Sequence, residues 1–185
     1  AMGLLLDGAR RITAADRFVR RGAWLQGRFP VTTRVGGKRL GIVGLGRIGQ
    51  AVARRAAGFD MHIAYHNRRP VEGVAWRHEP SLLALAEWAD FLVLTVAASA
   101  DTRQLINADV LTALGPKGLL VNVARGSVVD EAALIACLQN GSLGGAALDV
   151  FEDEPRVPEA LLALDQVVLA PHMASGTFET RQAMA

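Results

Sequence analysis

A glycine-rich turn between an apolar run and a helical stretch constrains this sequence more than any other feature. Gly-Leu-Gly-Arg-Ile-Gly at residues 44–49 directly follows the apolar run 40–43 and leads into an Ala/Arg-rich helical pattern. In such a unit Gly44 permits the tight turn, Gly46 lets the backbone approach a pyrophosphate, and Gly49 lets the helix pack closely on the strand. The free N–H groups of the first helical turn then face the anion. The motif therefore predicts a dinucleotide-binding turn.

Apolar runs and helical patterns alternate along the rest of the chain. We expect helices near 48–58, 81–87, 103–114 and 130–139, the last capped by Asp130 and stopped by Gly141, and buried strands at 39–43, 61–65, 91–96, 118–123, 144–150 and 167–170. Strands that are apolar throughout and separated by helices are typical of a parallel sheet covered on both faces. We predict an α/β fold of Rossmann type, a doubly wound parallel sheet whose strand carboxyl ends carry the cofactor.

The chain divides into three predicted regions. Residues 4–20 place apolar and charged side chains at helical spacing, which predicts one helix, and an irregular connector follows, so that 1–37 form an arm and connector. Residues 38–176 form the dinucleotide-binding domain, and 177–185 begin a further helix. The first helical pattern has no cap before it and the last stops within a turn, so we expect a domain of a longer protein.

Charge, cysteine content and hydropathy argue against a nucleic-acid partner, a metal site and a membrane span. The net charge is only +2 and acidic and basic residues are interspersed, which argues against a nucleic-acid partner. Cys137 is the one cysteine, so the chain can build neither a disulfide nor a thiolate metal site, and we expect no metal. No apolar run approaches the ~20 residues of a membrane span. No signal peptide is visible, and a cytoplasmic location is the expectation.

The end of the second strand bears on the choice of dinucleotide. NAD-binding domains of this type place an acid there for the ribose 2′-OH, but this chain has Asn67, 23 positions after Gly44. An acid repels a 2′-phosphate and Asn does not, and Arg68 and Arg69 can hold such a phosphate by charge-assisted, forked hydrogen bonds. The alternative is a pair of solvated loop arginines. The pattern favours NADP(H), with NAD(H) possible.

Three further segments carry a family resemblance. They are Val-Asn-Val-Ala-Arg-Gly-Ser-Val-Val-Asp-Glu at residues 121–131, Gly-Ala-Ala-Leu-Asp-Val-Phe-Glu-Asp-Glu-Pro at 145–155 and Pro-His-Met-Ala-Ser at 171–175. Behind the glycine turn, in this order, they resemble the cofactor-binding domain of the D-2-hydroxyacid dehydrogenases. With Asn-Arg-Arg at 67–69 the chain is similar to the NADP-preferring glyoxylate/hydroxypyruvate reductases. The resemblance extends over the whole chain.

The resemblance implies a catalytic trio. Arg125 matches the arginine that binds the substrate carboxylate and polarises its carbonyl, and His172 matches the general acid/base. The chemistry suits these types, since Arg binds a planar carboxylate at two points and a histidine that titrates near ~6.5 can supply a proton to the carbonyl oxygen. Glu154 matches the acid that orients the imidazole and favours its charged form. Only the motif selects Glu154, because Glu152 and Asp153 stand beside it in the same acidic loop.

The same matching implies further cofactor contacts. Asp149 matches an acid that accepts a hydrogen bond from the nicotinamide carboxamide, although a strand-end acid that caps a turn is the alternative. The other expected contacts are Arg47 and Ile48 at the pyrophosphate, Val96 to Thr102 on the adenosine side, Val123, Ala124 and Arg125 at the nicotinamide ribose, and His172 and Ser175 across the pocket. Residues 94–97 read Leu-Thr-Val-Ala where many members have Leu-His-x-Pro, which leaves the packing on the adenine in doubt.

The resemblance also implies partners and an activity. Family members pair this domain with a substrate domain built from both chain ends, to which the helix at 177–185 leads, and they dimerise through an arm that matches residues 4–35. We expect a homodimer that reduces glyoxylate, hydroxypyruvate or a similar small 2-oxo acid with NADPH. One alternative is an NAD-dependent dehydrogenase with another substrate preference. The other is a dinucleotide-sensing corepressor resembling the C-terminal-binding proteins.

Overall fold

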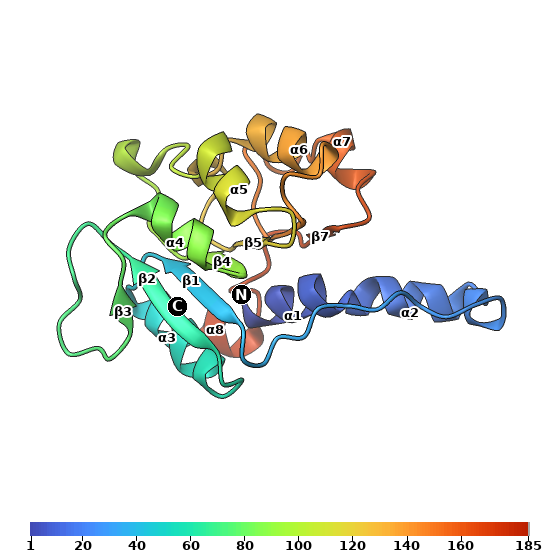
Figure 1. The fold of residues 1–185 in the computed structure, drawn as a ribbon, viewed down its shortest axis with the longest axis horizontal. Helices are drawn as coiled ribbons and strands as arrows, with labels where there is room; N and C mark the ends of the chain where they lie inside the picture. Colours follow the sequence, from blue (N-terminus) through green and yellow to red (C-terminus); the bar gives the residue numbers. More distant parts are fainter. Residues whose placement is uncertain (185) are drawn as a thin grey trace.

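A seven-stranded parallel sheet forms the centre of the computed structural model, which describes residues 1–184 (Figure 1). The strand order is β3-β2-β1-β4-β5-β6-β7, and every neighbouring pair is parallel. The strands are β1 (Arg39–Val43), β2 (His62–His66), β3 (Arg77–His78), β4 (Phe91–Leu94), β5 (Leu119–Asn122), β6 (Gly145–Leu148) and β7 (Val167–Leu169). Strands β2 and β3 lie on one side of β1, and strands β4 to β7 lie on its other side, so the strand order reverses between β1 and β4. This order confirms the predicted Rossmann-type α/β fold.

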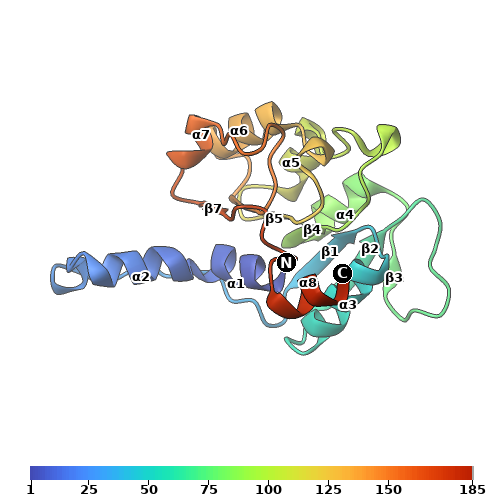
Figure 2. The same ribbon diagram turned by 180° about the vertical axis from the view of Figure 1, so that it is seen from behind.

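Helices cover both faces of this sheet. Helices α4, α5 and α6 lie over one face, and α1 and α3 lie over the other (Figures 1 and 2). The helices are α1 (Met2–Arg10), α2 (Ile12–Arg20), α3 (Arg47–Ala57), α4 (Leu82–Trp88), α5 (Ala108–Leu114), α6 (Glu131–Gln139), α7 (Glu159–Leu162) and α8 (Phe178–Met184), with short 3-10 turns η1 (Ala23–Leu25), η2 (Ala100–Thr102) and η3 (Gly126–Val128). No helix among residues 1–184 has the length and apolar character that crossing a bilayer requires.

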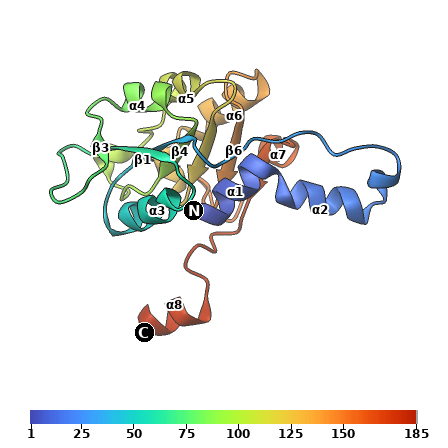
Figure 3. The same ribbon diagram turned by 60° about the horizontal axis from the view of Figure 1, so that its bottom comes forward.

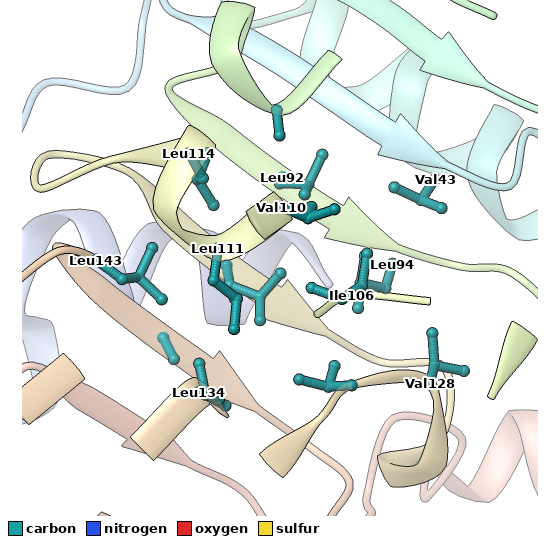
Figure 4. Packing of buried hydrophobic residues seen from close by; sticks show 14 of the residues in the cluster. Val43, Leu92, Leu94, Ile106, Val110, Leu111, Leu114, Val128, Leu134 and Leu143 are labelled. Atoms are coloured by element: carbon teal, nitrogen blue, oxygen red, sulfur yellow. The ribbon is translucent and has the colours of Figure 1, made fainter. Parts of the chain in front are cut away.

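Two apolar clusters hold the layers together. Successive strand residues point to opposite faces, so Leu92 and Leu94 enter the cluster under α4, α5 and α6, whereas Val93 enters the cluster with α1 and α3. In the first cluster Leu111 of α5 and Leu134 of α6 pack over the sheet (Figure 4). These side chains are almost fully buried. Burial of this kind, at about 25 cal/mol per Å² of apolar surface, holds the loops at the strand ends on a rigid base.

The N-terminal arm differs from the prediction. The single helix expected over residues 4–20 is wrong, because α1 ends at Arg10 and α2 starts at Ile12, with Arg11 in the left-handed region (φ 53°). Asp7 explains the break, since its carboxylate accepts the Thr13 N–H at 2.8 Å and caps the start of α2. The arm that begins with α2 projects away from the sheet (Figures 1 and 2).

Smaller elements also depart from expectation. The helix predicted over 103–114 begins only at Ala108, because the Asn107 side chain caps α5 by accepting the Val110 N–H at 3.1 Å. Strand β3 and helix α7 were not predicted, since two and four residues are too short for a periodic signal. The Asp130 cap of α6 is confirmed. Helix α8 lies apart from the sheet at the end of an extended segment (Figure 3).

Candidate active site

The glycine turn has the backbone geometry that the motif predicts. Gly44 has φ +97°, and a Cβ there would lie 2.7 Å from the Val96 backbone. A Cβ on Gly49 would lie 2.3 Å from the Gly44 carbonyl oxygen, so this glycine lets α3 pack against the end of β1. A Cβ on Gly46 meets nothing within 4 Å. The open space at Gly46 is where a phosphate would approach the backbone.

The start of α3 fits an anion. Gly46 is its N-cap, and among residues 1–184 no side chain caps it, so the first N–H groups are available to a ligand. Arg47 and Ile48 are exposed beside them. The N–H of Leu45 is already occupied, because the Asn67 side-chain oxygen accepts it at 2.7 Å. The residues present therefore fit a dinucleotide pyrophosphate.

The end of β2 is fixed to the glycine turn by Asn67. Besides the bond to the turn, the Asn67 carbonyl lies 3.0 Å from His78 Nε2 of β3. Arg68 and Arg69 follow and are exposed, and Arg68 Nη1 lies 3.3 Å from Asp101 Oδ2. Arg68 is thus an exposed arginine that is paired with one carboxylate. Both arginines stay in reach of a ligand at this edge.

The loop after β4 forms the other side of the adenosine region. Val96 is half-buried beside Gly44. The Thr102 hydroxyl accepts the Ser99 N–H at 2.8 Å and donates to the Ala97 carbonyl at 2.9 Å. The hydroxyl of Thr102 therefore braces the η2 turn, and its predicted contact with the cofactor remains a prediction.

Asn122 positions the loop that carries Arg125. This side chain is 1% exposed, accepts the Ala124 N–H at 3.0 Å and donates to the Arg125 carbonyl at 3.0 Å. The Arg125 guanidinium donates one bond to the Ala124 carbonyl at 2.6 Å, and the exposed side chain has other N–H groups for a ligand. Asn122 was not among the predicted site residues, although a polar residue that ends an apolar strand was the available signal. Val123 is half-buried and Ala124 is buried.

Gly126 brings the Arg125 loop against the loop after β6. A Cβ on Gly126 would lie 2.0 Å from the carbonyl carbon and oxygen of Phe151. Only glycine allows this approach of two backbones. The contact places Arg125 near the acidic loop that follows Phe151.

The three acids of that loop have different partners. Glu152 pairs with Arg103 at 3.2 Å, and Asp153 pairs with Arg156 at 2.8 Å. Glu154 Oε2 lies 2.6 Å from His172 Nδ1. The geometry thus selects Glu154 as the acid beside the histidine, a choice that the chemistry of the sequence left open.

The Glu154 carboxylate is stabilised in its charged form. Partial burial acts to raise its pKa, but hydrogen bonds from the His172 ring and the Phe151 N–H outweigh burial, so the pKa of Glu154 is lowered. The charge of Arg125 adds to this lowering of the pKa. The structure therefore pairs His172 with Glu154 and packs the loop that carries Arg125 against the start of the loop that carries Glu154.

Asp149 holds the backbone turn that carries His172. Its carboxylate is 1% exposed and accepts the N–H groups of Met173 at 2.8 Å and Ala174 at 2.9 Å. Its carbonyl accepts the His172 N–H at 2.9 Å, and His172 has φ 50°. The turn-capping role that the sequence left as an alternative is the one observed here, while the carboxamide contact remains a prediction. Ser175 is half-buried just beyond this turn.

A pocket of about 280 Å³ borders the histidine–glutamate pair. Its other walls are mainly apolar, with Phe151 and Pro155 from the loop after β6, Leu162 from α7 and Leu169 from β7. The arrangement as a whole offers an anion-binding turn, a guanidinium and a carboxylate-linked imidazole at one edge of the sheet. Those groups can bind a dinucleotide, hold a carboxylate and transfer a proton.

Comparisons with known proteins agree with this chemistry. Residues 2–174 match the family model of the NAD-binding domain of D-isomer-specific 2-hydroxyacid dehydrogenases. The whole chain is 50% identical to glyoxylate/hydroxypyruvate reductase A of Arabidopsis thaliana and 51% identical to hydroxyphenylpyruvate reductase of Plectranthus scutellarioides, and covers 59% of each. A solved NADPH-dependent glyoxylate/hydroxypyruvate reductase from Sinorhizobium meliloti, in complex with NADP and malonate, has a TM-score of 0.95 and 51% identity over 99% of this chain and 58% of that one. The chain thus spans about three fifths of these relatives.

Proposed function

The chain belongs to the family of D-isomer-specific 2-hydroxyacid dehydrogenases, and we propose that it is the cofactor-binding domain of an NADPH-dependent reductase of small 2-oxo acids. The single observation that carries this proposal is the bond from His172 to Glu154, beside the loop that carries Arg125. This group lies at the same sheet edge as the glycine turn. Glyoxylate and hydroxypyruvate are the proposed substrates.

Each residue of the trio has one task in the proposed mechanism. When bound at the glycine turn, the nicotinamide cofactor supplies the hydride for the substrate's carbonyl carbon. Arg125 binds the substrate carboxylate at two points and so orients the carbonyl. His172 holds a proton at Nε2, the ring nitrogen that Glu154 leaves free, and gives it to the carbonyl oxygen. Glu154 fixes the ring orientation, and Asp149 fixes the backbone under it.

The preference for NADPH rests on the end of β2. Asn67 in place of an acid leaves no charge to repel a 2′-phosphate, and the exposed Arg68 and Arg69 offer two guanidinium groups to it. The S. meliloti relative is named as NADPH-dependent. NADH binds the same turn in this proposal, but without the two ion pairs.

The remaining expectations concern assembly. Residues 38–176 act as the dinucleotide-binding domain, and 177–185 lead to a substrate domain that completes the site. The proposed location of the protein is the cytoplasm. Residues 1–37 serve as a dimerisation arm, supported by Trp24 and Leu25, which are 68% and 95% exposed at its tip. Apolar side chains so exposed mark a surface that another protein covers, here a second copy of the chain.

Steady-state reduction by the full-length protein tests the proposal. We expect His172→Gln to abolish turnover of glyoxylate and hydroxypyruvate and to leave NADPH binding unchanged, since His172 acts on the substrate. A substrate panel with hydroxyphenylpyruvate addresses the second relative. Unchanged turnover in the variant removes His172 from the mechanism. Absence of turnover in the wild type with every 2-oxo acid and both cofactors favours the dinucleotide-sensing alternative.

A second variant tests the cofactor. Replacing Arg68 and Arg69 together by Ala should weaken NADPH far more than NADH, because only NADPH carries the 2′-phosphate. Arg54→Ala is the matched control, because it removes an exposed arginine of α3, away from the end of β2. Equal losses for the two cofactors contradict the proposed 2′-phosphate site.

A further inference from the structure

An ion pair crosses the edge of the sheet at which the adenosine half of the cofactor would lie. Arg68 follows β2 and Asp101 lies in η2, after β4. Strand β1, which ends in the glycine turn, lies between these two strands. Arg68 Nη1 and Asp101 Oδ2 are 3.3 Å apart, so the pair joins the loops on the two sides of the turn.

We propose that Asp101 is a specificity-determining residue for the cofactor, since its carboxylate occupies Arg68 in the free protein and opposes the 2′-phosphate of NADPH. This inference rests on the proposed function, in which Arg68 binds that phosphate. Asp101 then reduces the preference for NADPH that Arg68 and Arg69 create. The preference of the protein is the difference between these two opposing effects.

The pair is weak enough for a phosphate to displace it. The two side chains are 89% and 74% exposed, and ion pairs so exposed contribute little. A phosphate monoester carries about −1.5 to −2 charges at pH 7 and three acceptor oxygens, so it outcompetes a single carboxylate for the Arg68 guanidinium.

Asp101 nevertheless stays close after it is displaced. The η2 turn that carries it is closed by the Thr102 hydroxyl, which bonds the Ser99 N–H at 2.8 Å and the Ala97 carbonyl at 2.9 Å. The backbone at Asp101 is therefore fixed, and the carboxylate can move only by rotating its short side chain. Its negative charge remains within a Debye length, about 8 Å at physiological salt, of the position of the phosphate.

NADH does not meet this opposition. Its ribose carries a neutral 2′-hydroxyl, which does not compete with a carboxylate for Arg68. The two cofactors share every other group, so the effect of Asp101 falls on the ratio of their affinities and not on binding in general.

Cofactor titrations of the full-length protein test the inference. We expect Asp101→Asn to lower the Kd for NADPH about two- to five-fold, the range set by one exposed charge, and to leave the Kd for NADH unchanged. The gain should shrink at high ionic strength, because salt screens exposed charges. Glu87→Gln makes the same change in net charge at the far end of α4 and should alter neither Kd.

The Arg68→Ala background separates this inference from the proposed function. In that background Asp101 has no Arg68 to occupy and opposes the phosphate only by its own charge, so the change that Asp101→Asn makes to the Kd for NADPH becomes smaller. An unchanged effect there, or no effect of Asp101→Asn in the wild type while Arg68→Ala weakens NADPH selectively, overturns the inference alone. If Arg68→Ala and the double Arg68/Arg69 variant both weaken the two cofactors equally, the proposed cofactor site and the inference fail together.

Discussion

Gly126→Ala should separate the two loops that carry the proposed catalytic groups. The added Cβ would lie 2.0 Å from the carbonyl carbon and oxygen of Phe151, whereas ordinary contact begins at 3.4 Å, so the loops must move apart by about 1.4 Å. That movement carries Arg125 away from the Glu154–His172 pair. Misplacement of reacting groups by ~1 Å can cost ~100-fold in rate, and we expect a loss of kcat of that order. Overpacking should also lower the free energy of unfolding by ~1–3 kcal/mol.

Steady-state kinetics on the full-length variant, with a denaturant titration, measures both effects. Binding of the adenosine half of the cofactor should change little, because the glycine turn follows β1, whereas the two loops that separate follow β5 and β6. Gly3→Ala is the matched control, since a Cβ there meets nothing within 4 Å. A Gly126→Ala protein with the kcat and the unfolding free energy of the wild type refutes the reasoning, because it shows that the loops tolerate the added methyl group without separating.

Three further predictions concern two residues of the site and one residue at the opposite edge of the sheet. The lowered pKa of Glu154 contributes stability above the ordinary glutamate pKa, about 4.3, and this stability is lost as the pH falls through the lower pKa of the folded state. Glu154→Gln should therefore flatten the acid limb of the unfolding free energy against pH. Asn122→Ala should cost ~1–3 kcal/mol, because the buried Ala124 N–H loses its partner and the Arg125 carbonyl keeps only the Val128 N–H. Asp90→Asn should cost ~1 kcal/mol at pH 7, since the Asp90 carboxylate accepts the Arg39 backbone N–H and two bonds from the Arg39 guanidinium, with which it forms an ion pair.

Each of these outcomes can be contradicted by denaturant titrations of the full-length protein. An acid limb of unchanged slope in Glu154→Gln shows that the carboxylate has no favourable partner. An unfolding free energy of Asn122→Ala within ~0.5 kcal/mol of the wild type means that water satisfies the Ala124 N–H. For Asp90→Asn, a cost that persists at a pH where Asp90 is protonated assigns the effect to shape and not to charge.

The sequence predicted the central sheet and the glycine turn well, because both depend on local pattern. Apolar runs bounded by helices identify buried parallel strands, and a glycine is required wherever a positive φ or a backbone contact excludes a Cβ. The positive φ of Gly44 and the close contact of Gly49 are local requirements of this kind. Strand β3 and helix α7 were not predicted because, with two and four residues, each covers only about one period of its pattern.

The site was harder to predict wherever the partner lies far along the chain. The pairing of Glu154 with His172 spans 18 positions, and that of Arg68 with Asp101 spans 33. Nothing in the acidic loop itself distinguishes Glu154 from Glu152, and only the family motif selected it. The break at Arg11 depends on the side chain of Asp7, and helical periodicity does not register such a bond.

The bond between Asn67 and the Leu45 N–H makes the choice of dinucleotide separable from the integrity of the turn. Aspartate has the same shape as asparagine and can accept the same N–H with one carboxylate oxygen. A single nucleotide change in the gene therefore suffices to exchange the amide for a charge at this position without loosening the loop. The preferred dinucleotide of such a protein can therefore change during evolution by one conservative substitution, without a change in the fold of the turn.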